Sequence, residues 1–314
     1  MKDYFIGVDG GGTKTEFVLT ENNGTVLNRI VLKGCNPNDI GVFESCKIIS
    51  DGIKTLLKDP SVTCSEVSVY AGVSGAGIGE NAKTMTEKLR KDFPEVIVKS
   101  DLTNAVETCL KGEKGIAVIC GTGISCAVYN GETYKVVGGY GHLFENGGSG
   151  YSIGKDGIIA ALKAEDGYGK DTVLKEYAYQ IYGSPLRAAL PRLLSGGKHE
   201  VSQMSPLVFR GAENGDKVCI EILENNFNSV IKFLNSVKEL FSSKNCKIGF
   251  IGGITKTQFF RSALKRAYFE NELVFTSLNP VYGAVRLAAK AADKKCDDEF
   301  DENYEQSLGR FQNA

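Results

Sequence analysis

The chain has 314 residues, of which 42% are hydrophobic and 24% are charged, and its 37 basic and 38 acidic side chains leave a formal net charge of −1. This balance excludes the basic surface expected of a protein that follows nucleic acid or an anionic membrane. No run approaches the roughly 18 apolar residues of a membrane span, and the opening MKDYFIGVDG lacks the apolar region of a signal peptide, so we expect a cytoplasmic protein. The length favours two domains.

Cysteine, histidine and glycine usage narrows the chemistry. Nine cysteines are scattered without a CxxC spacing, and only two histidines are present. We therefore expect free, buried thiols, and a zinc site or a Ser-His-Asp triad has little to build on. Glycine is the one excess, because 37 residues are about 12% of the chain against a usual value of about 7%.

Residues 1–112 predict a mixed α/β domain. Strands are expected in YFIGVD, in residues 15–20 and in TVLNRIVL, joined by a glycine turn and by Asn23-Gly24, a dipeptide typical of hairpins. Apolar residues at helical spacing over 43–57, a strand VSVYAGV, a helix over 81–93 and a strand VIVKSD follow.

The same pattern starts again about 111 residues later. GIAVIC, a turn at 121–123, ISCAVY, a second Asn-Gly turn and TYKVVGG repeat the opening meander, with Cys120 where the first copy has Asp9. The sequence therefore predicts an internal duplication, with domains at 1–112 and 113–314.

The rest of the second half is mainly helical. Residues 138–157 are too rich in glycine for a regular element and predict a binding loop. Helices are expected over 156–209, with breaks at 183–185 and 195–197, then from an Asp216 N-cap, over 258–269, and over 281–292. The helix over 281–292 is expected either to stay with the second domain or to pack back on the first. The acid-rich last 22 residues predict a solvated helix or a frayed tail.

The segment DGGGTKT at 9–15 has the composition of a phosphate-binding turn. It leads into a strand, so it is neither a Walker loop nor a dinucleotide fingerprint, both of which open a helix. It is either a simple tight turn or a set of backbone N–H donors for phosphate, supplemented by Thr13 and Lys14. Asp9 favours the second interpretation, because a carboxylate beside phosphates needs a cation such as Mg²⁺ between them.

Asp101 is the candidate general base. It ends a predicted strand and precedes a predicted helix, so it is either a helix N-cap or the group that accepts a proton from an attacking hydroxyl in phosphoryl transfer.

Five motifs in order carry a resemblance to a known family. GVDGGGTKT, SDLTNAV, ICGTG, GGYGHLFENGGSGYSIG and IGGI resemble the first phosphate, catalytic, second phosphate, sugar and adenosine motifs of the N-acetylglucosamine kinase and BadF/BadG-type ATPase family. The resemblance runs from Phe5 to about Ala289. It implies an α/β fold of two duplicated ribonuclease-H-like, actin-like ATPase domains around a central nucleotide and sugar cleft, with ATP and Mg²⁺ as cofactors, and it implies a homodimer.

The resemblance also implies roles for individual residues. Asp101 would be the catalytic base, and Asp9 would act on Mg²⁺ through water. The nucleotide would be bound by Gly11, Gly12, Thr13, Lys14, Gly121, Thr122, Gly123, Gly252 and Gly253. The sugar would be bound by Asn36, Ser125, Gly139, Tyr140, Gly141 and Asn146.

Two departures from the family pattern bear on the substrate. Tyr140 stands where relatives usually have tryptophan, and Asn146 stands where they have a carboxylate. A neutral amide still bonds a sugar hydroxyl but does not repel an anion. We therefore expect a kinase for N-acetylglucosamine, N-acetylmuramic acid or both in cell-wall or amino-sugar salvage, and position 6 of the sugar as acceptor follows from the resemblance alone.

Three alternatives stay open. The first is an ATP-driven iron–sulfur activator of a 2-hydroxyacyl-CoA dehydratase, although the KCAAGTG-like segment of such activators is absent, and Cys120 and Cys126 are better explained as strand residues. The second is a glucosamine kinase. The third is a sugar-responsive regulator on the same fold, which the intact Asp9, Asp101 and glycine turns make a poor fit.

Overall fold

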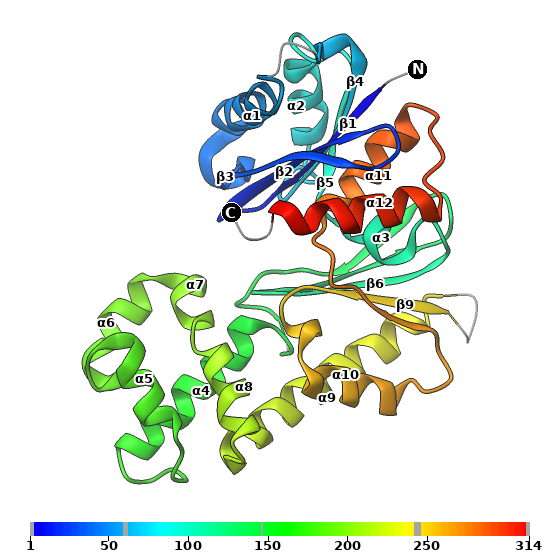
Figure 1. Ribbon diagram of the computed structural model, residues 1–314. Helices are drawn as coiled ribbons and strands as arrows, with labels where there is room; N and C mark the ends of the chain where they lie inside the picture. Colours follow the sequence, from blue (N-terminus) through cyan, green and yellow to red (C-terminus); the bar gives the residue numbers. More distant parts are fainter. Residues whose placement is uncertain (1–2, 59–61, 146, 242–245, 312–314) are drawn as a thin grey trace. The chain divides into compact units, whose positions relative to one another are not determined.

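The computed structural model describes residues 3–58, 62–145, 147–241 and 246–311. The chain divides into two compact units, unit 1 with residues 1–112 and 278–314, and unit 2 with residues 113–277. Each unit contains one five-stranded mixed sheet with helices packed on it (Figure 1). Within the described ranges, none of the helices combines the length and apolar character that crossing a bilayer requires.

The sheet of unit 1 has the strand order β3-β2-β1-β4-β5. The strands are β1 (Tyr4–Gly10), β2 (Lys14–Glu21), β3 (Val26–Lys33), β4 (Val67–Val73) and β5 (Val96–Ser100). The first three are antiparallel, as the hairpin signals predict, and β1, β4 and β5 run parallel. The carboxyl ends of these three parallel strands therefore meet at one edge of the sheet.

The two faces of this sheet carry different helices. Ile6 and Val8 of β1 belong to the core under α1 (Pro37–Leu56) and α2 (Asn81–Leu89). Between these two helices the chain forms the short 3-10 helix η1 (Cys64–Glu66) and strand β4. Phe5 belongs to the core under α11 (Val281–Ala291), and Gly7 lets the backbone of α11 approach β1 closely. Because strand side chains alternate, Asp9 lies on the side of α11 and of α3 (Leu102–Leu110).

Unit 2 repeats the topology of unit 1. Its strands are β6 (Gly115–Cys120), β7 (Ile124–Tyr129), β8 (Tyr134–Gly138), β9 (Lys247–Ile251) and β10 (Leu273–Phe275), in the order β10-β9-β6-β7-β8. Read from β8, this order matches β3-β2-β1-β4-β5 strand for strand. The predicted duplication is thus confirmed in the strand topology.

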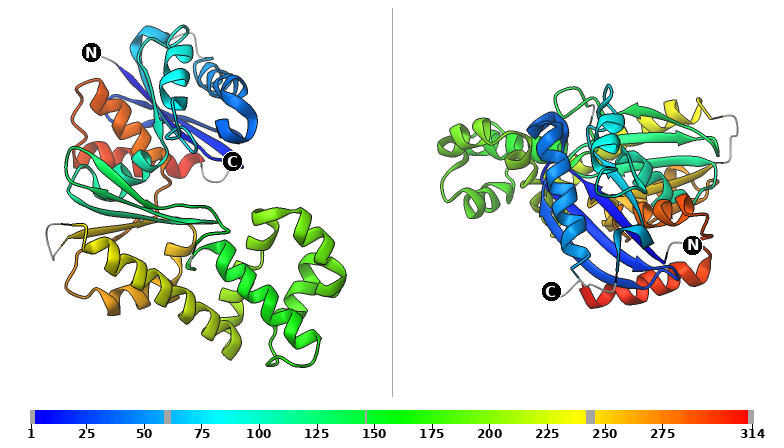
Figure 2. Two further views of the ribbon diagram at one scale, coloured as in Figure 1. Left: turned by 180° about the vertical axis from the view of Figure 1, so that it is seen from behind. Right: turned by 90° about the horizontal axis from the view of Figure 1, so that it is seen from above.

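A helical segment lies between β8 and β9 (Figure 2). Its side chains supply most of the core of unit 2. Its helices are α4 (Gly150–Glu165), α5 (Leu174–Tyr182), α6 (Leu186–Ser195), α7 (Gly197–Ser202), α8 (Ser205–Glu213) and α9 (Lys217–Lys238), while η2 (Ile254–Lys256) and α10 (Gln258–Ala267) follow β9. The two predicted breaks and the Asp216 N-cap are confirmed, but the segment also breaks between α4 and α5 and between α7 and α8, which the sequence pattern does not predict. The predicted loop over 138–157 was too long, because Ser149 and Ser152 cap a helix that begins at Gly150.

The C-terminal segment agrees with one expectation and corrects two others. Of the two placements expected for the helix over 281–292, the structure has the packing on the first domain, because α11 packs on β1 and α3. The domain range 113–314 is wrong, because residues 278–314 belong to unit 1. The acid-rich tail was expected to be solvated or frayed, but α12 (Asp298–Leu308) buries Phe300, Tyr304 and Leu308 in the core that contains α11, and η3 (Gly309–Phe311) follows it. Asp301 is buried, whereas the other acids of α12 are exposed (Asp298, Glu299, Glu302 and Glu305), so composition alone concealed the apolar stripe.

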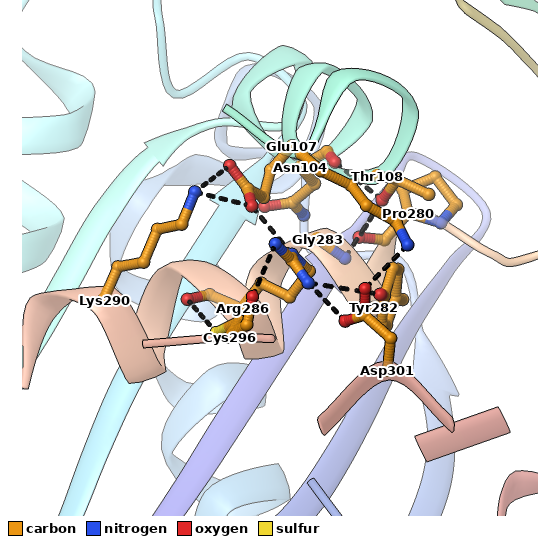
Figure 3. A network of polar contacts seen from close by, with 11 residues as sticks. Asn104, Glu107, Thr108, Pro280, Tyr282, Gly283, Arg286, Lys290, Cys296 and Asp301 are labelled. Carbon is orange, nitrogen blue, oxygen red and sulfur yellow. Dashed lines mark hydrogen bonds and ion pairs between the residues drawn. The ribbon is translucent and has the colours of Figure 1, made fainter. Parts of the chain in front are cut away.

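Buried charges join α3, α11 and α12 (Figure 3). Arg286 donates from Nε to Glu107 Oε1 at 2.8 Å and from Nη1 to Asp301. Lys290 reaches Glu107 at 2.8 Å, and Lys111 reaches Asp301 at 2.6 Å. Although burial opposes its charge, the hydrogen bond to Glu107 and the nearby acidic groups hold the pKa of Arg286 above its usual value. This network fixes α3, the helix that follows Asp101.

Candidate active site

Two acidic residues lie at the carboxyl edge of the parallel strands in unit 1. Asp9 is aligned with Gly72 of β4, and Gly72 is aligned with Lys99 of β5, so Asp101 follows the same edge two residues later. Ser74, just after β4, donates its backbone N–H to Gly10 O at 2.7 Å and links the ends of β1 and β4. The sheet thereby places Asp9 and Asp101 at the same edge.

Asp9 is held in place by Asn104 of α3. Asn104 Nδ2 donates to Asp9 Oδ1 at 3.0 Å. Burial raises the pKa of Asp9 from 3.8 to about 7; the Asn104 hydrogen bond opposes this rise, and the nearby charges of Asp101 and Glu16 add to it. Burial makes the negative charge of this carboxylate unfavourable unless a cation lies nearby, so Asp9 suits a position beside a bound cation.

Asp101 occupies the N-cap position of α3 but does not act as a cap. Its side chain makes no capping hydrogen bond, and instead it accepts a hydrogen bond from Ser100 Oγ at 3.2 Å. Burial raises the pKa of Asp101, while hydrogen bonds including those from Ser100 and Ser74 limit the rise. The side chain remains partly exposed, so it is accessible to a substrate hydroxyl. The structure thus shows no N-capping by Asp101, and its role as a general base stays a prediction.

The first glycine turn offers two free backbone donors rather than three. Gly11 N donates to Lys14 O at 2.9 Å and closes the hairpin, so this amide is not available to a phosphate. Gly12 and Thr13 are exposed, and within the described chain no acceptor is bonded to either amide. Lys14 is also exposed. Two adjacent amides with a hydroxyl and an ammonium group nearby form a suitable anion site.

Asn36 lies at the same edge. It caps α1 by accepting a hydrogen bond from Asn38 N at 3.0 Å, and its side chain abuts Gly75, where a Cβ atom would overlap Asn36 Oδ1. Oδ1 is therefore engaged, which leaves the amide nitrogen as the group that can contact a sugar hydroxyl.

The second glycine turn is pinned by helix α4. Gly121 N donates to Gly123 O at 3.0 Å, while Gly121 O and Thr122 O accept from Gly150 N and Tyr151 N at 2.8 and 3.1 Å. Thr122 and Gly123 are exposed, and their amides are bonded to no acceptor in the described chain. This turn again offers two donors, from the pseudo-equivalent place in unit 2.

Sequence reasoning missed the polar network behind this turn. Asn226, buried on α9, accepts at Oδ1 from Gly148 N and Ser152 Oγ, both at 2.9 Å. Glu145 bonds Ser149 and accepts from Ile124 N at 3.4 Å. The sequence feature that could have indicated this network is Asn226 itself, a single asparagine in the apolar stripe of a long helix, because a buried amide needs hydrogen-bond partners.

Most residues predicted to bind sugar in unit 2 cluster after β8. Gly138 pairs with Ser125, and Gly139 lies against the Ser125 side chain. Tyr140 is 73% exposed. A pocket of about 70 Å³ is lined by Ile124, Gly138, Gly139, Tyr140, Phe144, Glu145, Gly147, Ser229 and Phe233. Asn146 lies outside the described residues, and Gly141 is exposed within this loop.

Gly252 is the glycine whose replacement has the clearest expected effect. Its φ is +121°, and a Cβ atom would overlap the Cys120 carbonyl that precedes the second turn. We expect Gly252→Ala to destabilise the protein by about 1–3 kcal/mol and to weaken Mg·ADP binding, measured by thermal unfolding and calorimetry.

Gly253→Ala is the matched control for stability. Gly253 has no positive φ, and a Cβ atom added to it would meet no neighbouring atom within 4 Å. Its Tm should equal that of the wild type, and a Gly252→Ala protein with wild-type Tm would contradict the requirement for glycine.

Seven of the nine cysteines are buried, as the sequence predicts, but Cys64 is exposed and Cys296 is partly exposed. Cys120 ends β6 and Cys126 lies in β7, and both side chains are fully buried. Burial raises the pKa of Cys126 to about 12, so its thiol stays protonated at neutral pH. Neither thiol is presented at a surface.

The donors present suit a magnesium–nucleotide rather than a cage of protein ligands. Among the described residues, no three His, Cys, Asp or Glu side chains converge as a metal site. Mg²⁺ usually keeps several waters and takes one or two carboxylates together with substrate phosphates. Asp9, beside the free Gly12 and Thr13 amides, fits this mode.

The predicted residues thus fall into two groups. Unit 1 carries Asp9, residues 11–14, Asn36 and Asp101, and unit 2 carries residues 121–123, Ser125, residues 139–141 and Gly252 with Gly253. Two topologically equivalent α/β units, each with a glycine turn after its first strand, define an actin-like ATPase fold.

Comparisons with known proteins identify the family. The profile of the BadF/BadG/BcrA/BcrD ATPase family matches residues 6–288, and the chain belongs to this family. It is 30% identical to the N-acetyl-D-glucosamine kinase of Dictyostelium discoideum, over 91% of this chain and 98% of that protein. It is 28% identical to the N-acetylmuramic acid/N-acetylglucosamine kinase of Clostridium acetobutylicum, over 92% and 99%.

The fold has a close counterpart among solved structures. A candidate N-acetylglucosamine kinase from Chromobacterium violaceum superposes with a TM-score of 0.73 at 20% identity, over 91% of this chain and 99% of that one. Together with the sequence relatives, this places the chain among phosphotransferases that use an alcohol group as acceptor.

Proposed function

We propose that the protein is an ATP-dependent kinase for an N-acetylated amino sugar, either N-acetylglucosamine, N-acetylmuramic acid or both, with the hydroxyl at position 6 as acceptor. The observation that carries the proposal is Asp101, a partly exposed carboxylate with a raised pKa that does not cap its helix and shares a sheet edge with Asp9 and the free amides of Gly12 and Thr13. The names of the two sequence relatives support the substrate class.

The chemistry assigned to these residues is simple. Asp101 would accept the proton of the attacking sugar hydroxyl as the new bond to phosphorus forms. The amides of Gly12 and Thr13 and the ammonium group of Lys14 would neutralise phosphate charge. Mg²⁺, bound with ATP near Asp9, would supply further charge neutralisation at the phosphates.

The sugar loop supports an amino-sugar substrate. Tyr140 offers an exposed ring, and the neighbouring Gly139 and Gly141 leave the backbone open to hydroxyl groups. Asn146 in place of the family carboxylate removes one source of repulsion for the lactyl group of N-acetylmuramic acid. A site that bonds an acetamido group should reject sugars lacking it.

The test is ADP release from Mg·ATP with N-acetylglucosamine, N-acetylmuramic acid, glucosamine, glucose or no sugar. We expect turnover with the N-acetylated sugars only, and phosphorus NMR of the product should place the phosphate at position 6. Preference for glucosamine would overturn the proposed substrate. Slow ATP hydrolysis that no sugar stimulates, together with iron in anaerobically purified protein, would instead favour the iron–sulfur activator.

A further inference from the structure

Asn104 connects helix α3 with the strand ends near the site through one side-chain amide. It is fully buried on the first turn of α3, three residues after Asp101. Its Nδ2 donates to Asp9 Oδ1 at 3.0 Å and to Val8 O at 3.1 Å, and lies 3.5 Å from Gly72 O. One amide group thereby connects α3 with the carboxyl ends of β1 and β4.

The orientation of this amide follows from its surroundings. All three neighbouring groups are acceptors, so the nitrogen must face them. The consequence is that Asn104 Oδ1 has no hydrogen-bond partner within the described chain. Leaving a buried carbonyl oxygen unbonded costs stability, which argues that the side chain is present for what its nitrogen holds.

The neighbouring backbone leaves room for this contact. A Cβ atom on Gly72 would overlap the Asn104 amide, and one on Gly283 of α11 would overlap Asn104 O. One turn later, Thr108 Oγ1 donates to Asn104 O at 2.8 Å and accepts from Gly283 N at 3.0 Å. Thr108 thus anchors helix α3 to α11, while the Asn104 side chain contacts the Asp9 carboxylate.

We propose that Asn104 is a positioning residue that fixes the Asp9 carboxylate for the magnesium–nucleotide, an inference that rests on the proposed kinase function. Asn104 occupies Oδ1 of Asp9, and no donor in the described chain is bonded to Oδ2, so Oδ2 is the oxygen left to face the metal's water shell. Asp101 directly precedes the same helix, so one element positions the carboxylates of both Asp9 and Asp101.

The experiment compares Asn104→Ala with Thr108→Val in the full-length protein. Mg·ADP binding is measured by calorimetry, the Mg²⁺ dependence of sugar-stimulated ADP release by kinetics, and folding by thermal unfolding. For Asn104→Ala we expect a rise of about 10–100-fold in the Kd for Mg·ADP and in the half-saturating Mg²⁺ concentration, as for other residues that orient a metal-binding carboxylate. The KM for the amino sugar should stay within about twofold. Thr108→Val should lower the Tm but leave both magnesium readouts within about twofold.

A double-mutant cycle with Asp9→Asn tests whether Asn104 acts through Asp9. In the Asp9→Asn background, Asn104→Ala should cause no further loss of Mg·ADP affinity. Independent, additive losses would overturn the inference, as would equal magnesium effects of Asn104→Ala and Thr108→Val. If Asn104→Ala does not fold, Asn104→Ser replaces it in the same cycle.

Failure of the proposed function gives a different result. A wild-type protein that neither binds Mg·ADP nor shows sugar-dependent turnover contradicts the kinase itself. A wild type that does both, with an Asn104→Ala variant that matches Thr108→Val, contradicts only the role of Asn104.

Discussion

Asp101→Ala is expected to lower kcat by about 10²–10⁴-fold, the range for loss of a general base, with Mg·ADP affinity and Tm close to wild type. The reason is that Asp101 makes no capping hydrogen bond, so its removal costs α3 little, whereas the attacking hydroxyl loses its proton acceptor. The measurement is sugar-dependent ADP release, with calorimetry for the nucleotide.

The matched control is Asp51→Asn, an exposed carboxylate on α1 of the same unit. It should retain full turnover. Near-normal kcat for Asp101→Ala would reduce Asp101 to a residue at a helix start, and a large fall in Tm would show that its side chain stabilises the fold.

The pH dependence of kcat supplies a second readout for Asp101. A base acts only when ionised, and burial raises the pKa of Asp101 above its ordinary 3.8. Turnover should therefore fall as the pH is lowered through a pKa above 3.8, and Asp101→Ala should lose this acidic limb. An unchanged acidic limb in the variant would assign the titration to another group.

The local features of the site could be predicted because the chemistry that causes them is local. The Asn23-Gly24 hairpin, the two glycine turns and the Asp216 N-cap each depend on residues a few positions apart, and the structure shows all of them. The repeat of these signals after about 111 residues was enough to predict the duplicated topology.

Prediction stopped where a function depends on hydrogen-bond partners distant in sequence. Nothing in the string of glycines shows that the Gly11 amide closes the hairpin on Lys14, which reduces the number of free donors. The contact of Asn104 with Asp9 joins residues 95 positions apart, and that of Asn226 with Gly148 joins residues 78 apart. Such pairs follow from packing of whole elements, which no local pattern encodes.

The C-terminal helix shows the same limit. Asp301 is one of many acids in the tail, and composition favours solvent for all of them. Arg286, buried on α11, needs two carboxylates, and the structure supplies Glu107 from α3 and Asp301 from α12. The buried Arg286 therefore determines that Asp301 is the acid that turns inward. The prediction of a frayed tail was wrong because the tail sequence alone does not show this distant partner.

Arg286→Met is expected to cause the largest loss of stability. Met fills much of the same space but leaves Glu107 and Asp301 buried, and in the described part of the chain Lys290 and Lys111 are the cations that remain paired with them. Removing one partner of a buried pair typically costs about 3–5 kcal/mol, and we expect the lower end because both lysines remain. Urea unfolding gives the free energy, with the surface pair variant Lys54→Met as a control that should not differ from the wild type.

The triple variant Arg286→Met, Glu107→Gln and Asp301→Asn separates charge from packing. If uncompensated charge causes the loss of unfolding free energy, neutralising both carboxylates should recover most of the lost stability. The reason is that buried ion pairs contribute little net free energy relative to neutral groups that pack well. A triple variant no more stable than Arg286→Met would place the loss in packing and hydrogen bonds. Since Glu107 lies on the helix that begins at Asp101, the single variant should also lose kcat at temperatures where it stays folded, and unchanged kcat would show that α3 holds its position without the network.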